Sequence, residues 1–497
     1  MDFLSIVVAV LFAWTLVQGL CLLAKRSSSK SVGKKLPPGP FHWPVIGNLH
    51  LLGTQPHKSL SQLAQKYGPI MNLKLGLINT VIISSSAMAR EALQKQDLAF
   101  STRLVIDVVR AQNHSQFSVV WLPVASKWRT LRKIMNSNIF SGYKLDAGQQ
   151  LRARKIQELI TYCQNYSQAG EAVDIGRAAF RTTMNLLSNT IFSKDLCDPC
   201  SEFKDLVRNI MEEAETPNMV DYFPFLRKFD PQRLRRRMSG HFSKVLHIFR
   251  GLIDERLEER KVMSGNRNVD ILDTLLNISQ QTPDEIDNTL IQHNCLDLFI
   301  AGTDTTTSTI EWAMVKLLKN PETIAKAQAE LADVIDKGKL LNEADVSRLP
   351  YLQCIVKETL RLHPPAPLLL PCRVDQDVVL CGYTILKDSL VLFNVWAIWC
   401  DPNIWENPLM FKPERFWNSE IDVRGRDFEL IPFGAGRRIC PAMPLALRVI
   451  PVMLGSLLNS FQWKIDGDIE PKDLDMEEKF GTTSGKAHPL RAIPIPL

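Results

Sequence analysis

Apolar and polar positions recur along the chain mainly with the period of an α-helix. Between residues 150 and 369 the pattern is mostly helical, and segments such as 254–262 are rich in residues that favour helices. Short runs rich in β-branched and apolar residues, at 80–84 and 389–393, predict strands. Pro321 should end the apolar helix before it, because the residue preceding a proline is pushed out of the α region. The pattern predicts a mainly α fold with a minor β part.

The N-terminus is predicted to be a membrane anchor followed by a stiff hinge. Residues 3–24 contain no charged side chain, and about 20 such residues span a bilayer as a helix. A cleavable signal peptide is the alternative, but Asp2 stands where such a peptide carries basic residues. The basic flank 25–35 should hold the following chain in the cytosol by the positive-inside rule. The prolines of segment 36–40 prevent the helix from continuing.

Composition and charge indicate a folded body after this anchor. With 497 residues, 45% of them hydrophobic and 23% charged, the chain can bury a large core, although length alone permits two or three domains. The formal net charge of +6 is small and no nucleic-acid-binding motif is present, so no nucleic-acid partner is expected. The ten cysteines fit a cytosolic chain if most of them are reduced thiols.

A cysteine after a glycine-rich loop is the strongest chemical signal. Residues 433–441 read FGAGRRICP and place Cys440 just before an apolar helix predicted to begin near Met443. Glycines let a backbone approach a flat cofactor, and helix-terminal N–H groups with a nearby arginine favour a thiolate. A thiolate on haem iron favours O–O cleavage, as a monooxygenase requires. We therefore expect Cys440 to bind haem iron, although a buried structural thiol is the usual role of a free cysteine.

The second signal is a polar segment inside an apolar helix. Residues 301–306 read AGTDTT and follow the apolar run 295–300. Polar groups there carry a desolvation cost unless they are hydrogen-bonded or used. Gly302 and the threonine hydroxyls are expected to loosen the helical ladder, so that Thr305 can deliver protons to dioxygen with Asp304 as its feeder. The alternative is an ordinary helix whose threonines bond back to their own backbone.

Two weaker pairs complete the pattern. Glu358 and Arg361 share one helix face at i, i+3, and Arg415 in a proline-bounded segment could complete a buried network that serves the fold, although most such pairs are surface salt bridges. Trp128 and Arg132 share a face at i, i+4 and offer an indole N–H and a guanidinium to an anionic group such as a haem propionate. The alternative for this pair is a core tryptophan beside a surface arginine.

In their order and spacing, these four pieces resemble the cytochrome P450 superfamily over essentially the whole chain from the hinge onward. More closely, residues 301–306, 363–367, 433–441 and 478–481 resemble the plant enzymes similar to geraniol 8-hydroxylase. Members of that group oxidise monoterpenols, and others oxidise abietane-type diterpenes. The resemblance therefore implies a monooxygenase of plant specialised metabolism that inserts one oxygen atom from O2 into a lipophilic substrate.

The resemblance also implies the domain organisation and the cofactor. Residues 1–24 would be the anchor, residues 25–40 a basic linker and hinge, and residues 41–497 one catalytic domain that binds haem b. The protein would cross the endoplasmic reticulum membrane once, with its catalytic domain in the cytosol. Segment 222–226, followed by a basic run, is a further candidate for contact with membrane lipid.

Roles for individual residues follow from matching the family's motifs. The haem propionates would be held by Trp128, Arg132, Arg373 and Arg438, with Phe433 beside the cofactor. An NADPH-dependent diflavin reductase would dock on the cysteine side, on basic residues such as Lys127, Arg129 and Arg437. The candidate substrate contacts, most of them apolar, are Phe117, Ile300, Ala301, Leu368, Leu369 and Thr482.

The chain departs from the family pattern at two places. Ala442 stands where a glycine is usual, and Trp399 and Cys400 replace a pair that is usually Gly-Arg or similar. Neither change removes a chemical group, but Ala442 could crowd the haem. A paired cysteine motif at 197–200 lacks a second pair and is not expected to bind zinc.

Three rival functions remain. An enzyme of the same fold could rearrange or dehydrate its substrate without dioxygen, but such enzymes tend to lack the acid and alcohol of Asp304 and Thr305. A non-catalytic haem protein would not need both Cys440 and a proton relay. A hydroxylase of another lipophilic class, phenolic or alkaloid, would fit the same apolar contacts.

Overall fold

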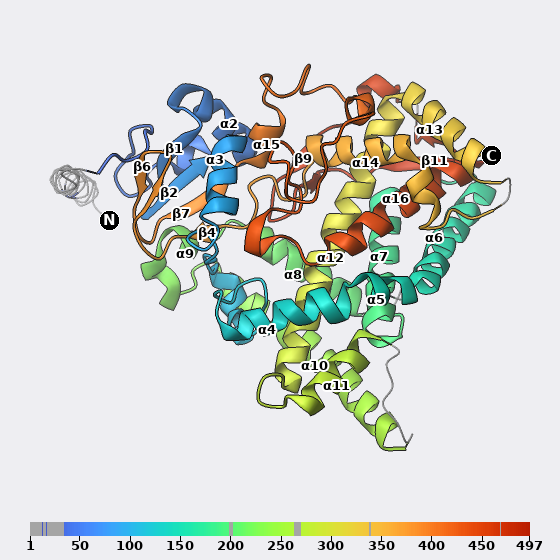
Figure 1. Cartoon of the computed structure of the whole chain (residues 1–497), viewed down its shortest axis with the longest axis horizontal. Coiled ribbons are helices and arrows are strands. Elements are labelled where there is room, and N and C mark those ends of the chain that lie inside the picture. Colours follow the sequence, from blue (N-terminus) through green and yellow to red (C-terminus); the bar gives the residue numbers. More distant parts are fainter. Residues whose placement is uncertain are drawn as a thin grey trace, which may run out of the picture.

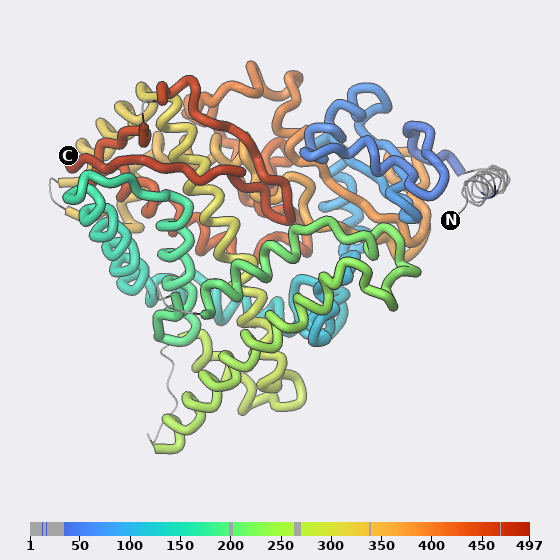
Figure 2. The backbone as a smooth tube through the Cα atoms, turned by 180° about the vertical axis from the view of Figure 1, so that it is seen from behind, coloured from blue at the N-terminus to red at the C-terminus, as the bar shows by residue number. Residues whose placement is uncertain are grey.

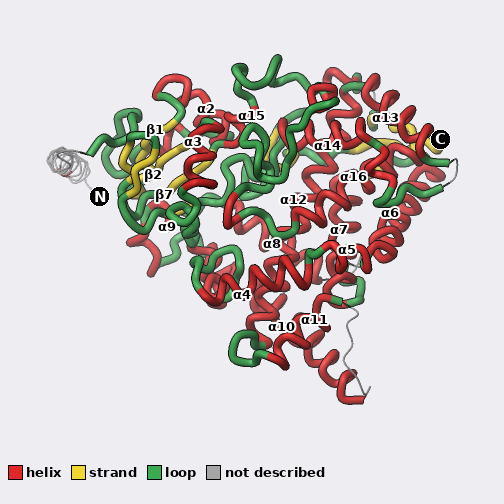
Figure 3. The backbone as a smooth tube through the Cα atoms, viewed as in Figure 1, coloured by secondary structure: helices red, strands yellow, loops and turns green. Residues whose placement is uncertain are grey.

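The computed structural model describes residues 34–197, 202–262, 270–336, 339–467 and 469–497, together with Phe12 and Leu16. These residues form a roughly triangular body in which helices predominate, with the largest sheet at one corner and smaller sheets elsewhere (Figures 1 and 3). The predicted mainly α fold with a minor β part is confirmed. The predicted anchor at 3–24 lies, apart from Phe12 and Leu16, outside the described residues.

One long helix, α12 (Asn288–Lys319), runs through the middle of the body (Figure 1). Its N-cap is Asp287, whose side chain accepts a hydrogen bond from the N–H of Leu290, and most of its residues are buried. It packs along α7 (Ile175–Phe192) and also contacts α8, α10, α14 and α16. Pro321 begins the next helix, α13 (Pro321–Val334), so the predicted end of α12 is confirmed.

The helices that pack directly on α12 include α7, α8, α10, α11, α13, α14 and α16. From behind, α8 and α10 run side by side across one face of the body (Figure 2). Besides α12, α7 and α13, the α-helices are α2 (Pro56–Tyr67), α3 (Ser86–Arg90), α4 (Ser126–Ile134), α5 (Gly142–Ala147), α6 (Gln149–Ala169), α8 (Glu202–Glu215), α9 (Met219–Tyr222), α10 (Leu234–Val262), α11 (Ile271–Gln281), α14 (Pro350–Leu362), α15 (Val395–Trp399) and α16 (Met443–Ser460).

The largest sheet joins segment 70–83 to segment 372–393. Its strands are β1 (Ile70–Leu75), β2 (Ile78–Ile83), β7 (Leu390–Phe393) and β4 (Cys372–Arg373), in the order β1-β2-β7-β4. β2 and β7 pair in parallel, with Thr80 opposite Leu390, and the other pairs are antiparallel. Both predicted strands are therefore confirmed. The smaller sheets contain β3 (Val173–Asp174), β11 (Arg491–Pro496) and β8 (Phe461–Ile465); β5 (Val378–Leu380) and β6 (Tyr383–Ile385); and β9 (Glu478–Lys479) and β10 (Gly485–Lys486).

Helix α16 begins at Met443, as predicted, and it is strongly apolar. Within the described ranges it is the one helix whose length and mean hydropathy of 1.4 would allow it to cross a bilayer. However, 61% of it is buried, and it packs against α6, α12, α13 and α14. These contacts identify α16 as a core helix that carries the cysteine loop at its N-terminal end.

A buried ion network ties α14 to η7 (Pro413–Phe416). Arg361 donates from Nε and Nη2 to the two oxygens of Glu358, at 2.7 and 2.9 Å, and Arg415 Nε lies 2.9 Å from Glu358 Oε1. Both members of the first pair are fully buried, and Arg361 also donates to the carbonyl of Trp399 at 2.7 Å. The structure thus brings together the three residues for which the sequence predicts a network. Two arginines share one carboxylate, so the network depends on the charge of Glu358.

We expect Glu358→Gln to lower the free energy of unfolding by about 3–5 kcal/mol, because it leaves two buried guanidiniums without a counter-charge. The control is Glu202→Gln, which breaks the exposed pair between Lys244 and Glu202 and should cost less than about 1 kcal/mol. Urea unfolding of the detergent-solubilised proteins, followed by circular dichroism, measures both. Equal losses in the two variants would contradict a special role for the network.

Candidate functional site

The loop before α16 has a backbone that only glycine accommodates at one position. Gly434 and Gly436 have φ of 72° and 65°. A Cβ on Gly436 would lie 2.0 Å from the carbonyl oxygen of Leu93, which is far too close for any side chain. The N–H of Cys440 closes the loop by donating to the carbonyl of Phe433 at 2.9 Å. The glycines thus hold Cys440 at the start of α16.

The Cys440 thiol is subject to opposing influences. Burial raises its pKa, while hydrogen bonds from the backbone N–H groups of Ala442 and Met443 and the charge of Arg132 lower it. These are the helix-terminal donors and the arginine that the sequence led us to expect beside a thiolate. A cation bound to the sulfur would stabilise the thiolate and so oppose the effect of burial on the pKa of Cys440.

Three guanidiniums, from Arg103, Arg132 and Arg438, lie near this loop without a balancing carboxylate. Arg438 donates to the carbonyls of Ser101 at 2.8 Å and of Val119 at 3.2 Å, and Arg132 donates to the carbonyl of Ile439 at 2.5 Å. Arg103 donates to the carbonyl of Leu370 at 2.7 Å, and its Nε is buried without a partner. Among the residues that the structure describes, none of the three forms an ion pair with Asp or Glu.

This unbalanced charge fits an anionic group. Burial, together with the charge of Arg103, lowers the pKa of Arg438 to about 9, so the cluster would be stabilised by a nearby carboxylate. The indole of Trp128 lies under the Arg438 guanidinium at 4.8 Å and donates to the carbonyl of Val119 at 3.1 Å. Haem b carries two propionates, and the residues present therefore fit that cofactor.

Two further predicted cofactor residues lie close to this cluster in the chain fold. Arg373, on β4 next to Cys372, pairs with exposed Asp375 at 3.1 Å, and its Nε is buried without a partner. Cys372 forms an isolated β-bridge with Arg103. Arg373 therefore lies next to the arginine cluster but is not part of it. Phe433 is half-buried and packs against the main hydrophobic core.

The polar segment of α12 presents an accessible face. Ala301 is exposed and Thr305 half-exposed, four residues apart, although the residues before and after this turn are buried. The Thr305 hydroxyl donates to the carbonyl of Ala301 at 2.9 Å, and those of Thr303, Thr306, Thr307 and Thr309 make the same bond to the residue four positions earlier. The predicted loosening is not seen: α12 is continuous here, because each hydroxyl finds its partner without displacing the backbone bond.

Asp304 lies on the next face and is largely buried. Burial raises its pKa, which a hydrogen bond from Thr483 and the charge of Lys479 oppose. Glu215 at the end of α8 lies close by: Lys479 Nζ is 3.4 Å from its carboxylate, and burial with the charge of Asp304 raises the Glu215 pKa to about 7. Nothing in the sequence pattern pointed to Glu215, because its partners are more than 80 residues away in the chain.

The predicted substrate contacts come from separate parts of the fold. Phe117 and Ile300 pack against the same hydrophobic cluster, and Ala301 lies beside them on α12. Leu368 and Leu369 pack against two other clusters. Exposed Thr482 donates to the carbonyl of Ala214 on α8 at 3.1 Å. The six side chains thus contact three different hydrophobic clusters or the solvent, and they do not form one surface.

The two departures from the family pattern are accommodated. Ala442 has φ −86° and ψ 3°, a conformation open to any residue, and it is the N-cap of α16. Trp399 is fully buried, and its carbonyl serves the Glu358 network. The backbone at Ala442 therefore does not require a glycine, and Trp399 fits in the core without the residue that is usual at its position.

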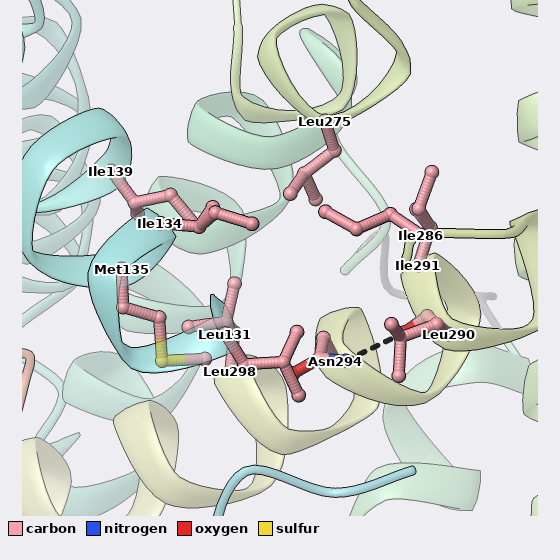
Figure 4. Close-up of a pocket in the computed structure, with 10 residues that line it drawn as sticks. All are labelled: Leu131, Ile134, Met135, Ile139, Leu275, Ile286, Leu290, Ile291, Asn294 and Leu298. Atoms are coloured by element: carbon pink, nitrogen blue, oxygen red, sulfur yellow. Dashed lines mark hydrogen bonds between the residues drawn. The ribbon is translucent and has the colours of Figure 1, made fainter. Parts of the chain in front are cut away.

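A small apolar pocket lies elsewhere, between α4, η4 (Met135–Ile139), α11 and α12 (Figure 4). Its one polar side chain, Asn294, donates to the carbonyl of Leu290 at 2.7 Å. None of the predicted site residues lines it. The lining residues are Leu131, Ile134, Met135, Ile139, Leu275, Ile286, Leu290, Ile291, Asn294 and Leu298.

Comparison with known proteins identifies the family. Residues 37–490 match the family described as Cytochrome P450. Two proteins named geraniol 8-hydroxylase, from Swertia mussotii and Catharanthus roseus, are each 62% identical over 100% of this chain and 99% and 100% of their own lengths. A 7-ethoxycoumarin O-deethylase from Helianthus tuberosus is 55% identical over the full length of both chains. The chain therefore belongs to the cytochrome P450 family, the monooxygenases that bind haem b through a cysteine thiolate.

Proposed function

We propose that this enzyme hydroxylates a terpenoid, either a monoterpenol such as geraniol or an abietane-type diterpene. The observation that carries the proposal is the 62% identity to two geraniol 8-hydroxylases along the entire chain. The acid and alcohol at Asp304 and Thr305 favour a reaction with dioxygen over a rearrangement without it.

In this proposal Cys440 would bind the haem iron through its sulfur, and the arginine cluster would hold the propionates. When bound, a thiolate-ligated haem supplies the activation of dioxygen. Burial raises the pKa of the Cys440 thiol, and the N–H groups at the start of α16 and Arg132 oppose it by favouring the anionic form of the sulfur. Arg132, Arg438 and Arg103 would orient the cofactor through its carboxylates, with Arg373 beside them, and the ring of Trp128 would support the Arg438 guanidinium.

Protons would be supplied by the acid and alcohol of α12. Burial favours the neutral form of Asp304, so this group can hold a proton inside the fold. Thr305 is the next residue and presents its hydroxyl on the accessible face. Rotation of that hydroxyl away from the carbonyl of Ala301 would let it donate toward the substrate side.

As a member of its family the enzyme takes electrons from a redox partner and uses dioxygen and a lipophilic substrate. We propose that the partner is an NADPH-dependent diflavin reductase that docks on exposed Lys127 and Arg129. Arg437 is also exposed, although it pairs with Asp97 at 3.0 Å. An acidic surface on the reductase would complement these cations.

We further propose a single-pass anchor at residues 1–24, a linker at 25–40 and a catalytic domain at 41–497, on the cytosolic side of the endoplasmic reticulum. Large apolar side chains are exposed near the start of the described chain and on the segment after α9; among them are Phe41, Trp43, Leu77, Phe225 and Phe229. The N–H of Leu77 donates to the carbonyl of Tyr222 at 3.0 Å, which joins the two regions. Such a patch suits contact with membrane lipid.

The substrate proposal is tested with membranes that contain this protein and a plant NADPH reductase. We expect one hydroxylated product, labelled from 18O2, with geraniol or an abietane diterpene, and slower turnover of 7-ethoxycoumarin. Product analysis by mass spectrometry measures both. If only 7-ethoxycoumarin is oxidised, the terpenoid assignment is wrong while the monooxygenase activity stands.

We expect Thr305→Ala to lower product formed per NADPH on the order of 100-fold, because general acid catalysis contributes at least that much. NADPH oxidation continues, and its electrons leave as hydrogen peroxide. Thr307→Ala is the matched control, since Thr307 makes the same bond to the carbonyl of Thr303 on a buried face of α12. Product and peroxide are both quantified; a similar loss in the two variants would mean that the helix, and not the hydroxyl, is responsible.

A further inference from the structure

A buried cluster of two histidines and an aspartate joins α12 to the segment before α4. His114 Nε2 lies 3.1 Å from Asp297 Oδ1, and His114 Nδ1 lies 2.9 Å from His293 Nδ1. Asp297 also accepts from the hydroxyl of Ser118 at 2.7 Å and the N–H of Val119 at 2.9 Å. We call these contacts the His–Asp clamp. No sequence motif predicted the clamp, because His114 and His293 are 179 residues apart along the chain.

Both oxygens of Asp297 have hydrogen-bonding partners in the clamp. Three donors surround a carboxylate that is 6% exposed, which compensates for its burial. Burial and the charges of His114 and Lys127 lower the pKa of His293 to about 3, so His293 is neutral at physiological pH. His293 also stacks on Phe117 at 4.8 Å, so the clamp continues into a predicted substrate contact.

The segment that the clamp holds has little regular structure of its own. The 3-10 helix η3 (Asp107–Gln116) is broken at Ala111, and Gln112 and Asn113 have φ of 49° and 57°. Left-handed backbone at such residues costs energy that the surroundings must supply. The position of this segment therefore depends on side-chain contacts at its ends.

One end is held by Asp107, which is fully buried. Its N–H donates to Asp221 at 2.7 Å, and its carboxylate lies 3.2 Å from Arg227 and 3.3 Å from Arg235. These partners belong to α9, η5 (Pro224–Lys228) and α10, on the side where the exposed apolar patch lies. The clamp is the anchor at the other end.

The clamp also lies between the proposed substrate face and the proposed haem-binding residues. Asp297 precedes Ile300 and Ala301 by one turn of α12. The carbonyl of Val119, whose N–H is bound by Asp297, accepts from both Trp128 and Arg438. A movement of the backbone at Val119 would therefore displace both Phe117 and the side chains of the arginine cluster.

We propose that His114 and Asp297 are positioning residues that fix segment 107–119 on α12 and thereby determine which carbon of the substrate is oxidised. The inference rests on the proposed function, because it takes Phe117, Ile300 and Ala301 to contact the substrate. A displacement of about 1 Å is enough to change reactivity by up to 100-fold. The clamp therefore acts on product identity and coupling, and not on the chemistry itself.

The test is Asp297→Asn in the full-length enzyme with its haem. The amide has the same size but cannot accept from all three donors. We expect the ratio of products to change at least threefold, and product per NADPH to fall about tenfold, while the carbon monoxide-bound haem spectrum stays within a factor of two of wild type. Hydrogen–deuterium exchange of peptides from 107–119 should quicken about tenfold, which gives a readout independent of turnover.

The matched control is Asp270→Asn. Asp270 is also buried and accepts from Arg256, Ser193 and the N–H of Asp273, but it ties α10 to α11 away from segment 107–119. Its variant should leave both the product ratio and the exchange of 107–119 unchanged. Equal effects in the two aspartate variants would mean general destabilisation and would overturn the proposal.

If Asp297→Asn does not retain haem, the proposal is tested with Ser118→Ala instead, because this variant removes a single hydrogen-bond donor to Asp297. A smaller change in the same product ratio and faster exchange are then expected, and unchanged values for both would reject the clamp. Assays use geraniol and 7-ethoxycoumarin in parallel. Failure of the wild type with geraniol would overturn only geraniol as the substrate, because exchange and deethylation still test the clamp.

Discussion

The fold depends on the burial of one helix that carries many polar groups. α12 passes through the core, and each of its buried polar side chains must find a partner there. The threonines solve this locally by bonding to their own helix. Asp297, Ser308 and Glu311 solve it at long range, by binding the backbone at Val119, Ser484 and Leu490. The polar groups of α12 thus recruit three distant segments to the neighbourhood of one accessible turn.

Two groups of arginines have different roles: one is neutralised within the fold, and the other has positive charge left for the cofactor. Arg361 and Arg415 are neutralised within the protein by Glu358 and close a network around the carbonyl of Trp399. Arg103, Arg132 and Arg438 have no carboxylate partner among the contacts described, so their charge stays available. The first arrangement is complete by itself, whereas the second is complete only with an added anion.

The sequence was sufficient for the features whose cause is local. Helix ends at prolines, the start of α16 and the strands at β2 and β7 follow from residue propensities and spacing, and so does the i, i+3 pair of Glu358 and Arg361. The site residues that were not predicted from the sequence have contact partners far away along the chain. Glu215, Arg103 and His114 are ordinary residues until folding places Lys479, Arg438 or Asp297 beside them. The loosening expected at Gly302 failed because a threonine hydroxyl can share a carbonyl without opening the helix.

The parallel pairing of β2 with β7 has a consequence for biosynthesis. Thr80 meets Leu390, so β2 has no partner on that edge until 310 further residues have been made. At roughly 5–20 residues per second, synthesis leaves this apolar edge open for tens of seconds. An unpaired edge is a template for pairing with other chains, and β2 presents such an edge throughout that interval. The sheet that is begun first is therefore among the last parts of the fold to be completed, and the chain is most open to wrong pairing before β7 is made.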